Sequence, residues 1–323
     1  MKLSIIIINW KSVSFLHKCL LTIYDQTQNI EFEIIVVDNA SYDGCQEMIA
    51  REFSKVKFVQ CEINLGFANA NNLGFQYSSG DILVFLNPDT EILKNALNTL
   101  YSFITSDARV GAVGCILLNS DLTIQTSCIQ AFPTILNQAL DNELLRMRFP
   151  KLKLWGIKPL FCNDGRPVQV DVISGACIMI KRQVFEEIGM FSTEYFMYSE
   201  DVDLCYKIKK IGLKVYHHCK AQIIHHGGGS SRKKQNSNFQ PVLIKESRMI
   251  YFKKTKGKFY ATKKKNAILC VSFCRILLLY LMLPVKKSPF GYQEFNRSFE
   301  KWKKVMRWSL GLERWTKTIS KEK

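Results

Sequence analysis

The chain has 323 residues, of which 47% are hydrophobic and 12% aromatic, so it can bury a sizeable core in one large domain or two smaller ones. This composition excludes a disordered chain, and 11 scattered cysteines without a CxxC pair favour buried thiols in a reducing compartment over a disulfide scaffold or a zinc site. The net charge is +17, but residues 1–226 contain 21 basic and 23 acidic side chains, whereas residues 227–323 contain 24 basic and 5 acidic ones. The whole basic excess therefore belongs to the last third of the chain.

The first hundred residues alternate short apolar, β-branched runs with segments of helical periodicity. This rhythm indicates an α/β fold with a mainly parallel central sheet, right-handed crossovers and flanking helices. Ligands of such sheets bind at the carboxyl ends of the strands. We predict strands at residues 3–8, 32–37, 56–59 and 82–86, and helices at residues 13–23, 48–53 and 68–77.

Polar residues gather where these four strands end. Asp38 can accept hydrogen bonds from a base or a ribose, or it can be an ordinary turn or helix cap. Asp89 can hold a divalent cation that neutralises a diphosphate, or it can cap a helix that starts near Ile92. The other candidates at strand ends are Asn9, Asn64, Gly66 and Asn87.

The middle of the chain is less regular. Residues 119–168 contain four prolines and predict a mobile loop with short helices, and residues 168–181 return to strand character. A helix is predicted at residues 201–211, followed by two short strands near residues 214–216 and 221–224.

Two clusters in this second half carry side chains suited to chemistry. Glu200, Asp201 and Asp203 follow an aromatic stretch, where an Asp at a helix start can act as a general base or simply favour the helix dipole. His225 and His226 lie at a predicted strand end beside three glycines, and the sequence does not separate them as metal ligands. An imidazole combined with carboxylate oxygens favours Mn²⁺, with Mg²⁺ also open.

Seven motifs, in this order, resemble the inverting family 2 glycosyltransferases of GT-A fold, and most closely their bacterial rhamnosyltransferase-like branch. The resemblance covers roughly residues 1–232. The motifs are residues 7–10 (IINW), 36–44 (VVDNASYDG), 64–74 (NLGFANANNLG), 86–90 (LNPDT), 174–177 (SGAC), 196–205 (FMYSEDVDLC) and 225–230 (HHGGGS).

The resemblance implies a role for each site residue. Asp38 would contact the nucleotide of a sugar nucleotide, in a pocket lined by Asn9, Asn64 and Gly66, with Asn87 nearby. Asp89 would be the last carboxylate of the family's DXD metal motif, where Asn87 replaces the first Asp, and His225 would be the second ligand of Mn²⁺ or Mg²⁺. Asp201 would be the catalytic base, and Glu200 would orient it or contact the acceptor.

The resemblance also implies the reaction. The enzyme would move a sugar, with inversion, from a nucleotide-diphosphate donor to a hydroxyl of a lipid-linked or polysaccharide acceptor in cell-surface glycan synthesis. The first candidate donor is dTDP-rhamnose, and a UDP-hexose is the alternative. A catalytically silent sugar-binding or scaffold subunit is disfavoured, because Asp38, Asp89, Asp201 and His225 occur together.

The basic tail predicts a second region at residues 233–323 after a catalytic domain at residues 1–232. Its apolar block at residues 268–283 contains Arg275 and is too short to span a membrane, but flanking lysines favour an anionic membrane surface. We therefore expect a cytoplasmic enzyme, peripheral on the inner face of the plasma membrane, without a signal peptide. The alternatives are a helix that packs on the catalytic domain, or a nucleic-acid-binding tail that stacks bases on Trp302, Trp308 and Trp315.

Overall fold

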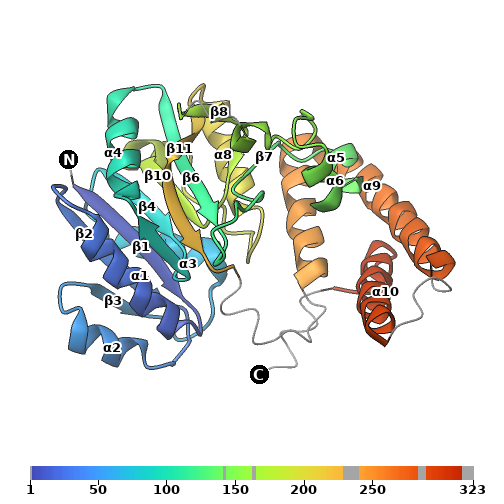
Figure 1. The fold of residues 1–323 in the computed structure, drawn as a ribbon, viewed down its shortest axis with the longest axis horizontal. Helices are drawn as coiled ribbons and strands as arrows, with labels where there is room; N and C mark the ends of the chain where they lie inside the picture. The colour runs from blue at the N-terminus through green and yellow to red at the C-terminus, as the bar shows by residue number, and fades with distance from the viewer. Residues whose placement is uncertain (1, 141–142, 162–164, 228–239, 283–288, 315–323) are drawn as a thin grey trace. The chain divides into compact units, whose positions relative to one another are not determined.

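The computed structural model describes residues 2–140, 143–161, 165–227, 240–282 and 289–314 (Figure 1). Two compact units make up the chain, and each includes more than one segment. The first unit consists of Met1–Phe132, Asn142–Phe196 and Glu200–Lys234, and the second of Pro133–Asp141, Met197–Ser199 and Gln235–Lys323. The domain boundary predicted at residues 232 and 233 lies outside the described residues.

The amino-terminal half of the first unit is a parallel sheet. Its strands are adjacent in the order β3, β2, β1, β4 (Figure 1). Because crossovers between parallel strands are right-handed, the helices after β1 and β2 cover one face and the helix after β3 covers the other. The predicted elements of this half are confirmed as β1 (Leu3–Asn9), α1 (Val13–Gln26), β2 (Phe32–Asp38), α2 (Cys45–Glu52), β3 (Lys57–Gln60), α3 (Gly66–Gln76) and β4 (Ile82–Leu86).

The second half extends this sheet with mostly antiparallel neighbours. Beyond β4 the order is β10, β6, β11, β5, and β8 pairs with β11. The strands are β5 (Thr90–Leu93), β6 (Val110–Leu118), β8 (Val168–Val170), β10 (Cys177–Lys181) and β11 (Lys214–His225), with β7 (Ile129–Gln130) and β9 (Val172–Ile173) in a separate small sheet. The helices are α4 (Ala96–Ser106), α6 (Glu143–Arg148), a 3₁₀ turn (Lys158–Phe161), α7 (Arg182–Glu187) and α8 (Glu200–Lys210).

Two sequence-based expectations are wrong in detail. Ile92 does not start a helix, because it pairs with Ile223 across β5 and β11, and the chain turns through left-handed Lys94 and Asn95 before α4 begins. The two short strands expected near residues 214–216 and 221–224 are one strand, β11, interrupted by a register shift between His218 and Gln222. Both errors arise from cross-strand pairing, which local periodicity does not report.

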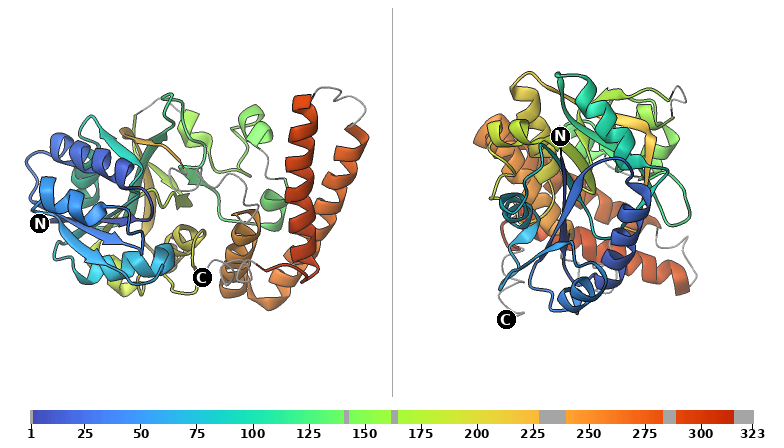
Figure 2. Two further views of the ribbon diagram at one scale, coloured as in Figure 1. Left: turned by 90° about the horizontal axis from the view of Figure 1, so that it is seen from below. Right: turned by 90° about the vertical axis from the view of Figure 1, so that its left-hand side faces the viewer.

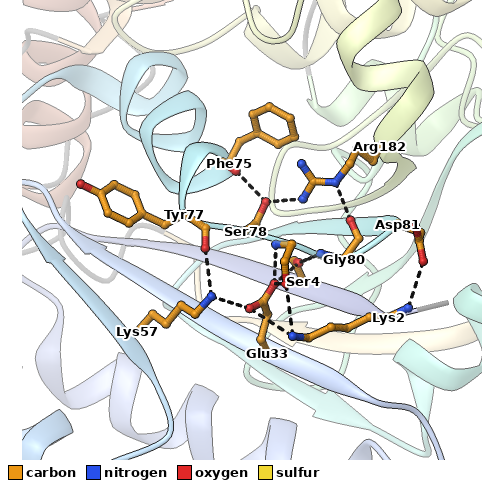
Figure 3. Close-up of polar contacts among 11 residues, drawn as sticks. Lys2, Ser4, Glu33, Lys57, Phe75, Tyr77, Ser78, Gly80, Asp81 and Arg182 are labelled. Atoms are coloured by element: carbon orange, nitrogen blue, oxygen red, sulfur yellow. Dashed lines mark hydrogen bonds and ion pairs between the residues drawn. The ribbon is translucent and has the colours of Figure 1, made fainter.

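At the amino ends of the parallel strands, a buried carboxylate ties four segments together (Figure 3). Glu33 on β2 accepts hydrogen bonds from Ser4 Oγ at 2.7 Å, the Ser79 amide at 2.6 Å and Lys57 Nζ at 2.8 Å. Burial alone would raise the pKa of Glu33, but the hydrogen bonds from Lys57, Ser4 and Ser79 outweigh it and hold that pKa well below its usual range. This network holds together the amino ends of the parallel strands, opposite the carboxyl ends where the polar residues lie.

The second unit is helical and contains α5 (Ile135–Ala139), α9 (Gln240–Met282) and α10 (Pro289–Ser309). Gly257, with φ of 84°, divides α9 into two helical parts. The second part lies beside α10 (Figure 2). The ring centroids of Tyr280 and Phe299 are 5.6 Å apart. None of the helices within the described ranges combines the length and apolar character needed to cross a bilayer.

Candidate active site

The carboxyl ends of β1 and β2 meet at Asn9 and Asp38, which pair directly in the sheet. Asn9 is buried, and its side-chain amide donates a hydrogen bond of 2.7 Å to Asp38 Oδ1. The other oxygen, Asp38 Oδ2, accepts from the Ser41 amide at 3.0 Å and from Gln60 Nε2 at 2.9 Å. Asp38 is thus a rigid, nearly buried carboxylate whose orientation is set by its neighbours.

Next to it, two asparagines join the end of β2 to the start of α3. Asn39 Nδ2 donates to Asn64 Oδ1 at 2.9 Å, and the same oxygen accepts from the Gly66 amide at 2.9 Å. Gly66 has φ of +77°, and a Cβ there would lie 2.4 Å from the carbonyl oxygen of Phe196. Only glycine permits this close approach, which brings the loop before α8 to the end of the parallel sheet.

Asp89 and His225 face each other where β4, β5 and β11 come together. Asp89 lies between β4 and β5, and His225 ends β11 opposite Thr90 of β5. Asp89 Oδ1 is 3.4 Å from His225 Nε2, and Asn87 Nδ2 is 3.3 Å from the same nitrogen. The structure therefore brings together the two residues that the sequence suggested as metal ligands.

Gln125 orients the imidazole of His225. Its Nε2 donates to the His225 carbonyl oxygen at 2.5 Å, so its Oε1 faces His225 Nδ1, at 2.9 Å, as an acceptor. Nδ1 must therefore carry the proton of the neutral imidazole, and the lone pair of Nε2 points toward Asp89. His226 contacts Glu91 Oε1 and Ser120 Oγ instead, at 2.8 Å each, so His225 is the one of the two histidines that faces Asp89.

A divalent cation fits between Asp89 and His225. Asp89 Oδ1 and His225 Nε2 are 3.4 Å apart, close to the spacing of roughly 3 Å between two ligands of one ion, and a carboxylate oxygen and an imidazole nitrogen both bind divalent cations. A second group of possible ligand atoms, in Asp38, Asp43 and Cys45, fits a metal less well. Burial, followed by the charges of Asp38 and Asp43, raises the pKa of the Cys45 thiol, so the thiolate that binds metals is disfavoured.

Asp201 lies in the first turn of α8, and backbone groups hold its carboxylate. Oδ1 accepts from the Val202 amide at 2.8 Å and Oδ2 from the Gly175 amide at 3.1 Å. Two successive non-glycine residues with positive φ, Tyr198 at 70° and Ser199 at 71°, precede the helix. Such strained backbone costs about 1–3 kcal/mol per residue and is concentrated at functional sites.

A short chain of contacts joins Asp201 to the Asp89 turn. The Asn87 amide, two residues before Asp89, donates to the Ala176 carbonyl at 3.0 Å, and Ala176 adjoins the Gly175 that binds Asp201. The turn of the candidate metal ligand Asp89 is therefore joined by these contacts to the turn that holds the candidate base Asp201.

The remaining acids of this cluster are less accessible. Glu200 is 6% exposed and Asp203 is 2% exposed, whereas Asp201 is half-buried. Asp203 accepts a hydrogen bond from Ser192 Oγ at 2.5 Å and lies 4.0 Å from Lys207 Nζ, so it anchors the helix to the preceding loop. Of the three carboxylates, Asp201 is the one best placed to meet a substrate.

Some residues of the site were missed by the sequence analysis. Gln125 comes from the irregular segment between β6 and β7, and Glu91 from an unexpected strand, so no pattern marked either of them. The contact from the Gly175 amide had a signal, because Gly175 belongs to the SGAC motif.

Comparison with known proteins shows the family to which this chain is related. The model for glycosyl transferase family 2 matches residues 4–189. A low-salt glycan biosynthesis hexosyltransferase of Haloferax volcanii is 26% identical over 217 residues, covering 66% of this chain and 63% of its own. An N-acetylglucosaminyl-diphospho-decaprenol L-rhamnosyltransferase of Mycobacterium tuberculosis is 26% identical over 206 residues, covering 60% and 66%. The match thus spans less than two thirds of either relative.

Among solved structures, a mannosyltransferase of Pyrobaculum calidifontis in complex with GDP-Man and Mn²⁺ superposes with a TM-score of 0.58 at 14% identity, covering 96% of this chain and 86% of that chain. At this identity the likeness concerns the fold. It establishes the GT-A architecture, with a mainly parallel central sheet and a helical C-terminal region.

Proposed function

Because the chain belongs to glycosyl transferase family 2, we propose that it transfers a sugar, with inversion, from a nucleoside diphosphate donor to a hydroxyl of a glycan acceptor. The observation that carries the proposal is the contact between the turn of Asp89 and the turn that holds Asp201. The family resemblance makes dTDP-rhamnose the first candidate donor and a UDP-hexose the second, and relatives named as a rhamnosyltransferase and a hexosyltransferase support a rhamnosyl or hexosyl group. A lipid-linked or polysaccharide acceptor in cell-surface glycan synthesis fits the same relatives.

In this proposal Asp201 is the general base. Its carboxylate takes the proton of the acceptor hydroxyl while that oxygen forms a bond to the anomeric carbon and the bond to the nucleoside diphosphate breaks on the opposite face. The amides of Gly175 and Val202 hold both carboxylate oxygens in place. Glu200, the residue before Asp201 in the chain, orients Asp201 or contacts the acceptor.

The donor would be bound at the strand ends. Asp38 would accept hydrogen bonds from the nucleoside, Asn9 would hold Asp38 in position, and Asn64, Gly66 and Asn87 would line the pocket. Asp89 and His225 would hold Mn²⁺ or Mg²⁺, which when bound neutralises the negative charge of the leaving diphosphate. The solved mannosyltransferase of the same fold contains Mn²⁺, which supports a divalent cation in the proposed reaction.

We also propose that the C-terminal unit attaches the enzyme peripherally to an anionic membrane surface, on the cytoplasmic face. On the second part of α9, Phe273, Leu277 and Leu281 recur every four residues and are 61%, 51% and 66% exposed. Exposed lysines such as Lys263 lie on the same helix, a combination typical of interfacial helices. Leu283, the end of the predicted apolar block, is outside the described residues.

The nucleic-acid alternative finds less support. Trp308 is buried and donates its indole N–H to Glu246 at 3.1 Å, and the ring of Trp302 is covered by the guanidinium of Arg275 at 4.5 Å. The ring of Trp308 is therefore not free to stack on a base, and one face of the Trp302 ring is occupied. Trp315, the third of these residues, lies outside the described residues.

The proposal is tested by thermal unfolding with a panel of nucleotide sugars, with and without Mn²⁺. We expect one donor to raise the melting temperature in a Mn²⁺-dependent way. His225→Ala should weaken binding of that donor at least tenfold. His226→Ala is the neighbouring control, because His226 contacts Glu91, and it should bind the donor normally. Failure of every nucleotide sugar to stabilise the protein, or equal loss in both variants, would contradict the assignment.

A further inference from the structure

A lysine in the C-terminal unit is buried without a hydrogen-bond partner. Lys264 lies in the second part of α9 and is 1% exposed, and its ammonium group makes no hydrogen bond to any described residue. The ammonium lies over the ring of Phe252, with Nζ 4.3 Å from the ring centroid. Such a cation–π contact offsets only part of the cost of removing an ammonium ion from water.

Two more cations share these surroundings. Lys245, Arg248 and Phe252 are spaced three and four residues apart, so they lie on one face of the first part of α9, and Lys264 meets that face at Phe252. Burial, followed by the charges of Arg248 and Lys245, lowers the pKa of Lys264 well below its usual value. Lys245 and Arg248 are half-buried, so the cluster reaches the surface through them.

The chain connects this helix face to the segment that precedes the candidate base. Ser247, adjacent to Arg248, donates a hydrogen bond of 2.7 Å from Oγ to the carbonyl oxygen of Met197. Met197 belongs to the same unit as α9 and stands three residues before Glu200. The cationic face is therefore anchored to the chain that leads into α8.

We propose that Lys264, Arg248 and Lys245 form a binding site for a phosphate or diphosphate group, supplied by the acceptor. The ammonium groups and the planar guanidinium fork together offer more donors than a carboxylate can accept, whereas a phosphoryl group has enough oxygens to contact all three. This inference rests on the proposed function, in which the acceptor is lipid-linked. The mycobacterial relative is named as an N-acetylglucosaminyl-diphospho-decaprenol L-rhamnosyltransferase, a name that contains a diphosphate.

The site is tested with inorganic diphosphate, in EDTA so that no divalent cation is available at Asp89 and His225. We expect diphosphate to raise the melting temperature of the full chain and of Lys263→Met, whose exposed side chain is the neighbouring control. Lys264→Met should bind diphosphate at least tenfold more weakly, and its melting temperature without ligand should be equal or higher, because a buried cation without a partner has been removed. Lys245→Met, at a half-buried position, should also weaken binding severalfold.

Equal stabilisation of the full chain and Lys264→Met, or no stabilisation by millimolar diphosphate, would overturn the site. The source is distinguished by farnesyl diphosphate in detergent and by phosphatidylglycerol vesicles. We expect Lys264→Met to lose affinity for farnesyl diphosphate but to retain vesicle binding; the reverse pattern would assign the cluster to lipid headgroups and contradict the proposal. Donor binding with Mn²⁺, measured on the same variant, should be unchanged, so failure of this site is distinguishable from failure of the proposed transferase.

Discussion

Gln125 offers a sharp test of the metal assignment, because it holds His225 through two atoms. Its Oε1 accepts from Nδ1 at 2.9 Å and its Nε2 donates to the His225 carbonyl at 2.5 Å. Removing the partner of a metal-binding histidine costs about 10–100-fold in metal affinity. At about 1.4 kcal/mol per tenfold, this corresponds to about 1.4–2.8 kcal/mol of binding free energy.

The assay compares Gln125→Met with Gln125→Glu in a titration with Mn²⁺, in which electron paramagnetic resonance measures the concentration of the free ion. Both variants lose the donor to the backbone carbonyl, so the difference between them isolates the acceptor at Nδ1. We expect Gln125→Met to bind Mn²⁺ about 10–100-fold more weakly than the unaltered chain, and Gln125→Glu to bind at least about tenfold more tightly than Gln125→Met. Gln169→Met, on the exposed side of β8, controls for the substitution itself. Equal affinities of Gln125→Met and Gln125→Glu would refute the argument that Gln125 positions His225.

Three further outcomes are expected from other parts of the structure. Glu33→Gln should lower the free energy of unfolding at pH 7 by about 1.5–3 kcal/mol, the contribution of a charge-assisted hydrogen bond. Because folding lowers the pKa of Glu33, this difference should be complete above the unfolded pKa of about 4.3 and should vanish as the pH falls toward the lowered folded pKa. A difference that is the same in chemical denaturation at pH 3 and at pH 7 would contradict this prediction. Gly66→Ala should destabilise the fold more than Gly189→Ala. Both glycines have positive φ, +77° and +73°, but only a Cβ at position 66 would clash with a neighbour. Equal melting temperatures of the two variants would argue against the contact with Phe196. Leu277→Glu should reduce flotation with anionic liposomes. Leu21→Glu, at an equally exposed leucine of α1, should not reduce it. Equal recovery of the two variants with liposomes would count against attachment through α9.

The amino-terminal half could be predicted from sequence because each of its strands is followed by the helix that packs on it. Buried strands such as residues 3–8 and helices with Leu16 and Ile23 inward are local patterns, and their order implies the parallel sheet and its ligand-binding edge. The motif resemblance then singled out Asp38, Asp89 and Asp201 among many strand-end acids. Their functional roles are still predictions.

Contacts distant in sequence were beyond this reasoning. Strand β5 is defined by pairing with β11, more than 120 residues later, and the choice between His225 and His226 depends on Gln125, 100 residues earlier. A one-residue change of register exchanges the two faces of a strand, so no local pattern decides which histidine meets Asp89. Lys264 was one of several lysines in a basic tail, and only the packing of α9 around Gly257 distinguishes it.

The central claim is that Asp201 removes the proton of the acceptor while other residues bind the donor. It is tested most directly by measuring, on Asp201→Asn, both sugar transfer and the affinity for the nucleotide sugar in Mn²⁺. Asn keeps the size of the side chain but does not accept a proton at neutral pH, so we expect transfer to fall by about 10²–10⁴-fold, the contribution of a general base, with donor affinity unchanged. Retention of transfer, or loss of donor affinity in step with transfer, would contradict the account.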